Sequence, residues 1–211
     1  MARGRFITFE GGEGGGKSTQ VRALAARLEN EGVEVVATRE PGGSVGAESI
    51  RDLLVTGSAD RWSPITETLL MYAARRDHIE RVITPALARG AWVVCDRFAD
   101  STRAYQGAGG GTDPALIAAL EAHVLGEMRP DLTLILDLPV TEGLRRAHRR
   151  SGDETRFESK GAAFHEKLRQ GFLAIARAEP GRCVVIDAAQ PVEAVGEAIW
   201  GAVSARLPLH A

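Results

Sequence analysis

The chain has 211 residues, and its 26 basic and 28 acidic side chains give a formal net charge of −2. This near-neutral balance gives no hint of a general nucleic-acid or membrane-binding surface, and neither partner is expected. No apolar stretch approaches the length of about 18 residues that a membrane span needs. A chain of this length is expected to form one domain over 1–211 and to bury about 70% of its unfolded surface.

Cysteine use and the start of the chain favour a cytoplasmic protein. Cys95 and Cys183 are its two cysteines, and both lie in apolar runs, where a thiol usually acts as a small buried hydrophobe. A disulfide framework is therefore not expected, which fits a reducing compartment. The first apolar run, at 6–9, is only long enough for a strand, so we expect no signal peptide.

The predicted strand at 6–9 runs directly into a glycine-rich loop. The loop reads Gly11-x-x-x-x-Gly16-Lys17-Ser18, the full pattern of a phosphate-binding loop. Its glycines let backbone N–H groups turn toward phosphates at the positive end of the following helix. Lys17 adds a mobile charge, and the Ser18 hydroxyl can ligate Mg²⁺. A plain glycine-rich turn is the alternative, but all four fixed positions are filled, so we expect the chain to bind a nucleoside triphosphate.

Apolar runs and helical patterns alternate along the chain. Strands are expected at 6–9, 33–38, 92–96, 132–137 and 183–187. Helices are expected at 17–31, 45–56, 64–89, 113–125, 140–150, 158–178 and 191–206. This alternation predicts an α/β fold, with a five-stranded parallel sheet and helices on both faces. Irregular segments at 39–44 and 96–111 follow the second and third strands, where a second substrate could face the triphosphate.

The helix expected at 64–89 combines an apolar stripe with a polar face. The stripe is expected in the core and consists of Ile65, Leu69, Tyr72, Ile79, Ile83 and Leu87. Met71, Arg75 and His78 share a different face. Arg75 could donate to a base carbonyl while Met71 packs on the ring. A solvated arginine is the alternative, and it is the commoner outcome for an isolated arginine.

The third strand ends in Asp96-Arg97. A carboxylate at the tip of an apolar strand near a phosphate loop can orient Mg²⁺ or its waters. The adjacent arginine can grip a phosphoryl group through its planar fork. The alternative is an ion pair at the protein surface.

Five arginines gather near the irregular segment at 151–156. They are Arg145, Arg146, Arg149, Arg150 and Arg156. Like charges at i and i+4 disfavour an isolated helix, and a polyanion would relieve their repulsion. We interpret the segment as a mobile lid that brings an arginine to the transferred phosphate. The alternative is a solvated basic face paired with Asp153, Glu154 and Glu158. The five histidines have no metal-ligand spacing, and no catalytic role is expected for them.

Together these motifs resemble the thymidylate kinase family. The matching segments are 9–18, 38–43, 73–76, 96–107 and 130–133. The similarity runs across nearly the whole chain, and the run from Asp96-Arg97 through Ser101 to Tyr105-Gln106 is specific to this family. The resemblance implies a P-loop kinase fold with a short lid. It also implies transfer of the γ-phosphoryl group of ATP to dTMP for dTTP synthesis, with Mg²⁺, in a homodimer formed through the helix near 64–89.

The resemblance also implies roles at the acceptor side. Glu13 would hold the deoxyribose 3′-hydroxyl, and Arg97 would bridge the donor and acceptor phosphates. The acceptor phosphate would lie near Arg39 and Arg51. The dTMP site would comprise Glu13, Arg39, Arg51, Met71, Arg75, Arg97, Thr102, Tyr105 and Gln106. Within it, Arg75 would reach the thymine carbonyl, Thr102 and Gln106 would contact the base, and Tyr105 would leave no room for a ribose 2′-hydroxyl.

The implied donor site lies in the loop and the lid. ATP would contact Gly11, Gly12, Glu13, Gly14, Gly15, Gly16, Lys17, Ser18, Thr19 and Arg149. Mg²⁺ would be held by Ser18 and Asp96. The implied catalytic residues are Lys17, Arg97, Arg156 and Glu13.

Some family members carry the catalytic arginine in the phosphate loop, and others carry it in the lid. Gly14-Gly15 and the arginine-rich segment resemble the second, bacterial style, with the lid at about 149–158. Arg156 matches the lid motif best, with Arg149 and Arg150 as further candidates. Met71 departs from the family, because a Phe that stacks on thymine is common at its position.

Two other functions stay open on the sequence alone. One is a kinase for another nucleotide or small metabolite, against which the Tyr105-Gln106 pair argues. The other is a nucleoside-triphosphate switch that hydrolyses slowly and signals to a protein partner. A guanine-binding Asn-Lys-x-Asp run would favour the switch, and the sequence contains none.

Overall fold

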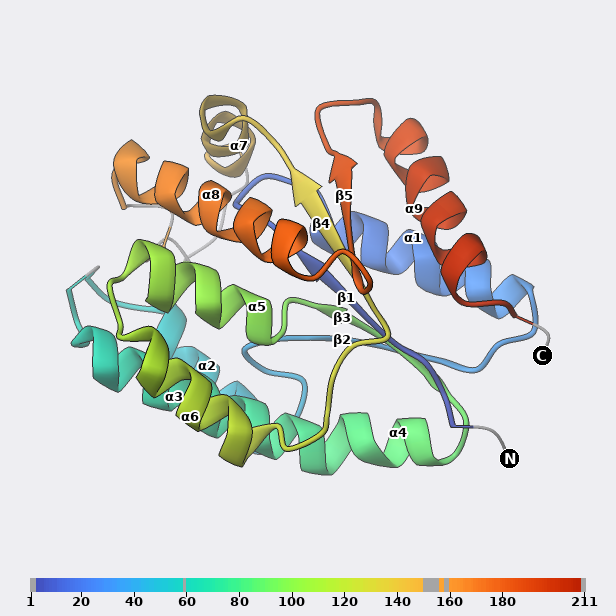
Figure 1. Cartoon of the computed structure of the whole chain (residues 1–211), viewed down its shortest axis with the longest axis horizontal. Helices are drawn as coiled ribbons and strands as arrows, with labels where there is room; N and C mark the ends of the chain where they lie inside the picture. Colours follow the sequence, from blue (N-terminus) through green and yellow to red (C-terminus); the bar gives the residue numbers. More distant parts are fainter. Residues whose placement is uncertain (1–2, 59, 150–155, 158–159, 210–211) are drawn as a thin grey trace.

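In the computed structural model, which describes residues 3–58, 60–149, 156–157 and 160–209, five parallel strands form the centre of the fold (Figure 1). They are β1 (Phe6–Glu10), β2 (Val35–Arg39), β3 (Trp92–Asp96), β4 (Leu132–Asp137) and β5 (Cys183–Asp187). Their order in the sheet is β2-β3-β1-β4-β5. The predicted α/β fold with a five-stranded parallel sheet is therefore confirmed.

Helices cover both faces of this sheet (Figure 1). One face carries α1 (Lys17–Asn30) and α9 (Val192–Arg206), which pack on each other and on the strands. The opposite side carries α2 (Val45–Val55), α3 (Pro64–His78), η1 (Ile79–Ile83), α4 (Thr84–Ala88), α5 (Ala99–Thr102), η2 (Arg103–Gly109), α6 (Pro114–Val124) and α8 (Ala162–Ala178). The short α7 (Val140–Ala147) follows β4. Among the described residues, no helix is long and apolar enough to cross a membrane.

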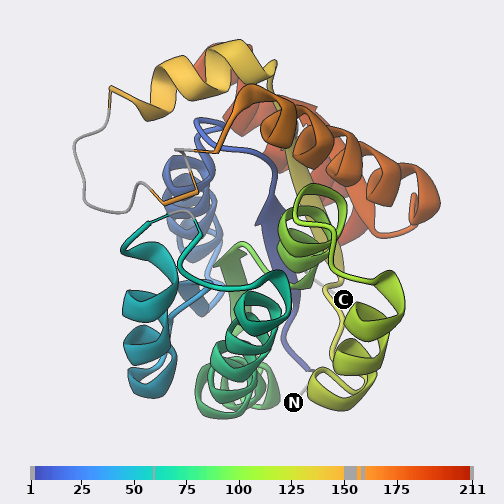
Figure 2. The ribbon, with the colours of Figure 1, turned by 90° about the vertical axis from the view of Figure 1, so that its left-hand side faces the viewer.

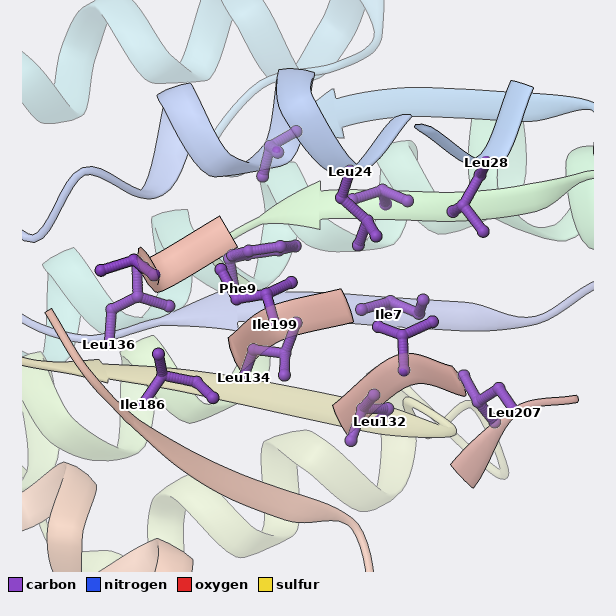
Figure 3. Packing of buried hydrophobic residues seen from close by; sticks show 14 of the residues in the cluster. Ile7, Phe9, Leu24, Leu28, Leu132, Leu134, Leu136, Ile186, Ile199 and Leu207 are labelled. Carbon is purple, nitrogen blue, oxygen red and sulfur yellow. The ribbon is translucent and has the colours of Figure 1, made fainter. Parts of the chain in front are cut away.

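Side chains of β1 alternate between two hydrophobic cores, because successive residues of a strand point to opposite faces. Ile7 and Phe9 pack with Leu24 of α1 and Ile199 of α9 (Figure 3). Phe6 packs in the other core, with residues of η1, α4 and α6. Every residue of β1 is buried. Packing on both faces therefore fixes β1, and β1 in turn positions the glycine-rich loop at the carboxyl edge of the sheet.

The segment expected as one helix at 64–89 contains a π-helical turn. It runs as α3, the five-residue η1 and α4, and the Thr84 N–H bonds to Ile79 O, five residues back. Pro85 follows directly and has no N–H for an α-helical bond to Arg81. The wider turn therefore accommodates the proline without leaving an α-helical hydrogen bond broken at that point.

Part of the apolar stripe predicted on this helix is not in the core. Tyr72, Ile79, Ile83 and Leu87 are buried, whereas Ile65 is 55% and Leu69 is 48% exposed. The prediction for Ile65 and Leu69 is wrong because the inward face of α3 is largely polar. Glu67, Thr68 and Arg75 lie on that face and are buried.

The segment at 96–111, predicted to be irregular, is mostly helical. It forms α5 and the π-helical η2, which packs closely against α8. An added Cβ on Gly171 of α8 would lie 2.9 Å from the Ala108 Cβ, so small side chains permit this close contact. The glycines at 107–111 give the sequence the look of a loop.

The predicted ends of two further helices shift. The helix expected at 140–150 ends at Ala147, and the helix expected at 158–178 begins at Ala162, after Gly161. Residues 150–155 and 158–159, including Arg150, Asp153, Glu154 and Glu158, lie outside the described residues. Most of the segment predicted as a lid therefore has no structural description.

Candidate active site

A cleft of about 350 Å³ opens at the carboxyl edge of the sheet. The edge faces the viewer in Figure 2, with α2 and α3 on one side of it and α7 and α8 on the other. The predicted site residues that line the cleft are Glu13, Gly14, Gly15, Gly16, Lys17, Ser18, Arg39, Arg51, Met71, Arg75, Asp96, Arg97, Thr102, Tyr105 and Gln106. They come from several separate segments of the sequence, which the strand order brings to one place.

The phosphate-binding loop has the backbone that its glycines permit. Gly11, Gly14 and Gly16 have φ values of 126°, 72° and 81°, a region that glycine enters freely. Gly14 also approaches another segment closely, because an added Cβ would lie 2.1 Å from the Gly143 carbonyl oxygen of α7. Thr19 is exposed in the first turn of α1.

Lys17 lies at the start of α1 and points back over the loop. Its Nζ donates to the carbonyl oxygens of Gly11 at 3.1 Å and Gly12 at 2.6 Å. Burial lowers the pKa of Lys17 to about 8, and the positive charge of Arg97 adds to this shift. The ammonium group is thus held close to the place where the loop can receive phosphates.

Ser18 and Asp96 place two hard oxygen donors together. The Ser18 hydroxyl donates to Asp96 Oδ2 at 2.5 Å, and both residues line the cleft. A hydroxyl and a carboxylate are ligands that suit Mg²⁺. No cluster of three His, Cys, Asp or Glu residues able to hold a metal occurs in the described part of the chain. Mg²⁺ typically takes only one or two protein oxygens and completes its shell with substrate phosphates and water, a pattern that this pair suits.

Arg97 has φ = 72°, the left-handed region that side chains other than glycine seldom enter. Its backbone N–H donates to Phe9 O at 2.8 Å, which holds that conformation. Its guanidinium donates to Gly11 O at 2.9 Å and to Glu13 Oε1 at 3.1 Å, and it lies 4.8 Å from the centre of the Tyr105 ring. Backbone strain of this kind costs about 1–3 kcal/mol and is typical of functional sites.

Glu13 and Tyr105 meet beside Arg97. The Tyr105 hydroxyl donates to Glu13 Oε1 at 2.5 Å. Burial raises the pKa of Tyr105 well above its ordinary value, so the phenol keeps its proton. The pair forms a polar wall between the phosphate loop and η2.

Arg75 is buried, so the alternative of a solvated arginine is wrong. Its guanidinium donates to Glu40 Oε2 at 2.7 Å, Thr102 Oγ1 at 3.0 Å and Phe98 O at 2.9 Å. Its side chain is 2% exposed. The other oxygen of Glu40 pairs with His78 Nδ1 at 3.0 Å. Glu40 and His78 thus hold Arg75 in place at the wall of the cleft.

Sequence reasoning missed the role of Glu40, although it lies in the segment 38–43 and a carboxylate was needed for any buried arginine. It also missed Glu10, which accepts from Phe98 N at 2.8 Å and Ser101 Oγ at 2.6 Å. Burial raises the pKa of Glu10 to about 8, and the nearby Asp100 carboxylate adds to the shift. The predicted strand ends at position 9, so Glu10 was not recognised as a buried residue of that strand.

Arg39 and Arg51 approach the cleft from β2 and α2. Arg39 pairs with Glu48 at 3.1 Å and remains half exposed, while Arg51 donates to Pro41 O at 2.7 Å. The peptide bond between Glu40 and Pro41 is cis. Both arginines line the cleft, where an anion could reach them.

Two predicted arginines do not line the cleft in this structure. Arg149 is exposed after α7. Arg156 is buried and pairs with Glu67 of α3 at 2.5 Å. Its neighbour Phe157 does line the cleft. The catalytic role of Arg156 and the ATP-binding role of Arg149 stay predictions.

A glycine-rich phosphate loop that shares one cleft with several guanidinium groups defines a P-loop phosphotransferase. The sequence model of the family described as thymidylate kinase matches residues 9–199. The chain belongs to the thymidylate kinase family. It is 68% identical over 209 residues to a thymidylate kinase of Caulobacter vibrioides, covering 99% of this chain and 100% of that protein. It is 56% identical over 207 residues to a thymidylate kinase of a Bradyrhizobium species, covering 97% and 92%.

A solved structure supports the same assignment. The crystal structure of thymidylate kinase from Ehrlichia chaffeensis matches with a TM-score of 0.78 and 36% sequence identity. The match covers 95% of this chain and 99% of that one. The predicted family is thus confirmed by sequence and by fold, and the chain is an enzyme of this family.

Proposed function

We propose that this chain transfers the γ-phosphoryl group of ATP to dTMP, giving ADP and dTDP. The observation that carries the proposal is one cleft that the phosphate loop shares with a second set of cationic and polar side chains, from β2, α2, α3 and η2. Membership of the thymidylate kinase family gives the substrates. Such a cleft can hold both substrates in line, and phosphoryl transfer depends mainly on positioning and charge stabilisation.

The donor phosphates bind at the loop in this proposal. The backbone N–H groups of the glycine-rich loop and the ammonium of Lys17 receive the β- and γ-phosphates, and ATP also contacts Thr19 in the first turn of α1. Arg97 bridges the donor and acceptor phosphates, because its guanidinium lies between Gly11 and Glu13 of the loop and the Tyr105 ring of η2. Fixed donors of this kind stabilise the charge that spreads over the transferred group.

The acceptor lies toward α2, α3 and η2. Arg39 and Arg51 face its phosphate, and Glu13 receives the 3′-hydroxyl of its sugar while Tyr105 closes the space beside it. Arg75 donates to a thymine carbonyl. Thr102, Gln106 and Met71 complete the base site, where the thioether of Met71 packs on the ring. All of these residues line the cleft.

Mg²⁺ is part of this proposal. Ser18 and Asp96 hold it, which their contact at 2.5 Å supports. When bound, the ion neutralises charge on the donor phosphates. In this proposal Arg149 and Arg156, from the segment at 149–158, add positive charge near the ATP phosphates. The segment also helps to exclude water from the cleft.

We also propose a cytoplasmic homodimer of single-domain chains. The apolar side chains Ile65 and Leu69 of α3, with Val45 and Leu53 of α2, are 39–90% exposed on two adjoining helices. A partner subunit would cover them. Cys95 and Cys183 are free and buried, which supports a reducing compartment.

An acceptor panel tests the proposed function. ADP release from ATP–Mg²⁺ is measured with dTMP, dUMP, dCMP, dGMP and dAMP, and with no acceptor. We expect fast release with dTMP and slower release with dUMP. Preference for another nucleotide would keep the phosphotransfer chemistry and overturn the base site. Release that ignores every acceptor would overturn the kinase assignment.

A further inference from the structure

Glu67 joins two parts of the cleft that are far apart in the sequence. It lies in the first half of α3, and its side chain is 6% exposed. One carboxylate oxygen, Oε1, accepts from Gln106 Nε2 at 2.9 Å, and the other, Oε2, accepts from Arg156 Nη2 at 2.5 Å. A buried carboxylate requires such partners, because an unpaired buried charge is strongly destabilising.

Arg156 is bound firmly to the elements around Glu67. Its side chain is fully buried, and it also donates to Leu54 O at 3.1 Å and Ser58 O at 3.0 Å. These carbonyls lie at and beyond the end of α2, where a cation is favourable. The guanidinium therefore ties the chain at position 156 to α2 and α3 together.

The contacts of Arg156 place the next residue, Phe157, in the wall of the cleft. Its ring meets Tyr105 at right angles, with 5.6 Å between ring centres, and it packs against the cluster that contains Val55 and Met71. Lys160 Nζ lies 5.4 Å from its ring centre. The aromatic surface beside Met71 thus comes from residue 157, and Arg156 fixes its position.

Glu67 also fixes which end of the Gln106 amide faces the cleft. A carboxylate only accepts hydrogen bonds, so the NH₂ group of Gln106 must face Glu67. No described residue donates to Gln106 Oε1, and this oxygen is not fully buried. Because Gln106 lines the cleft, its Oε1 is open to the cleft. The cleft therefore presents an acceptor at this point.

An acceptor there distinguishes pyrimidines by chemistry. Thymine and uracil carry an N3–H donor, whereas N3 of cytosine is an acceptor. We propose that Glu67 is a positioning residue that sets this preference by orienting the Gln106 amide. The same carboxylate binds Arg156, and it thereby also holds Phe157 in its position beside the base site; we call this link the coupling. This inference rests on the proposed function, because it concerns the acceptor of the same reaction.

The variant Glu67→Gln tests the proposal. The buried guanidinium of Arg156 needs an acceptor, so the carbonyl of the introduced amide faces it and the NH₂ of that amide faces Gln106. The Gln106 amide then turns and presents a donor to the cleft. We expect the kcat/KM for dTMP to fall by about ten- to a hundredfold, and the preference for dTMP over dCMP to fall by a similar factor, with the KM for ATP unchanged.

A matched control and a rescue variant make the test specific. Glu80→Gln makes the same change in an exposed pair with Arg76 on the same helical segment and should behave as wild type. The double variant Glu67→Gln/Gln106→Glu restores an acceptor toward the base and keeps the net charge. It should regain preference for dTMP over dCMP relative to Glu67→Gln. An unchanged preference in Glu67→Gln, or a double variant no more selective than the single one, would overturn the proposal.

Arg156→Lys tests the coupling even if Glu67→Gln does not fold. A lysine keeps the charge but cannot reach Glu67 and both carbonyls together. We expect weaker dTMP binding by calorimetry without ATP, and an unchanged preference between dTMP and dCMP. dTMP binding equal to that of wild type in Arg156→Lys would overturn the coupling, whatever the effect of the variant on kcat. Wild-type protein that does not phosphorylate dTMP would instead refute the proposed function.

Discussion

Arg97 is the residue on which the proposed chemistry depends most directly. It keeps an unfavourable backbone conformation while its guanidinium contacts Gly11 and Glu13 of the glycine-rich loop. The sequence predicts the importance of this position from its place at the end of an apolar strand. It does not predict the positive φ, because that conformation depends on the bond from the Arg97 N–H to Phe9 O in the adjacent strand.

Arg97→Ala should reduce turnover far more than it weakens ATP binding. We expect kcat to fall by about 10³-fold or more, because an arginine that stabilises the transferred phosphoryl group contributes on this scale. Steady-state kinetics with dTMP and calorimetric titration with ATP measure the two effects. Arg89→Ala, in an exposed pair with Glu34, is the control. Near-normal turnover would remove Arg97 from the mechanism.

Glu10 should make stability depend on pH. Its pKa in the folded protein is about 8, above the ordinary 4.5, because of burial and the nearby Asp100. Protonation therefore favours the folded state, and this contribution is full below pH 4.5 and is lost as the pH rises through 8. Glu10→Gln cannot ionise. The free energy of unfolding of this variant, relative to that of wild type, should therefore increase by up to about 1.4 kcal/mol per pH unit between about pH 5.5 and 8.

Urea unfolding at several pH values measures this difference. Glu34→Gln, at an exposed position, should show a constant difference from wild type over the same range. Parallel profiles for Glu10→Gln and wild type would show that Glu10 is ionised throughout.

The residues missed at this scale are mostly carboxylates. Lys17, Ser18 and Asp96 were predictable because they belong to a spaced motif or a strand end. Glu40 and Glu67 were not, because each acts through a buried arginine that is distant in sequence. The sequence pattern of one segment does not show which residues of a distant segment its side chains will contact.

At the scale of elements, the turn from β1 into α1 is the most constrained. Gly14 has a positive φ and packs against the Gly143 carbonyl of α7. The ends of the strands agree closely with the prediction, because short apolar runs bounded by polar ones are a strong signal. The π-helical turns were not predicted, because Pro85 does not by itself specify the bond from Thr84 to Ile79, and η2 lies in close tertiary contact with α8.

Gly14→Ala should destabilise the protein and weaken ATP binding. The positive φ alone costs an alanine about 1–2 kcal/mol, and the contact of its Cβ with the Gly143 carbonyl adds to this. Gly201→Ala on α9 is the control, because a Cβ there meets nothing within 4 Å. It should leave stability unchanged or raise it by about 0.5–1 kcal/mol. Urea denaturation measures both, and wild-type stability in Gly14→Ala would contradict the account of this turn.

At the scale of the whole molecule, the strand order β2-β3-β1-β4-β5 brings the segments after β1, β2 and β3 to one edge. Hydrophobic periodicity predicts a parallel sheet but not this order, which depends on contacts between distant segments. The exposed side chains of α2 and α3 belong to the same scale. Ile65 and Leu69 are predicted as core, and their exposure supports the proposed dimer.

Leu69→Glu should shift the protein from dimer to monomer. A charge within the apolar surface proposed as the interface loses its hydration on association, which disfavours the contact. Sedimentation velocity over a concentration series measures the assembly. Val192→Glu on α9, where the valine is 57% exposed, is a control of the same chemistry and should remain dimeric. A monomeric wild-type protein at all concentrations would refute the proposed dimer.

The fate of the γ-phosphoryl group tests the central claim most directly. The protein is incubated with γ-labelled ATP, Mg²⁺ and dTMP, and the label is followed in dTDP and in inorganic phosphate. The account predicts one labelled dTDP for each ATP consumed, and little release of label when dTMP is omitted. Label that appears as inorganic phosphate at the same rate with and without dTMP would contradict the account and indicate a hydrolase.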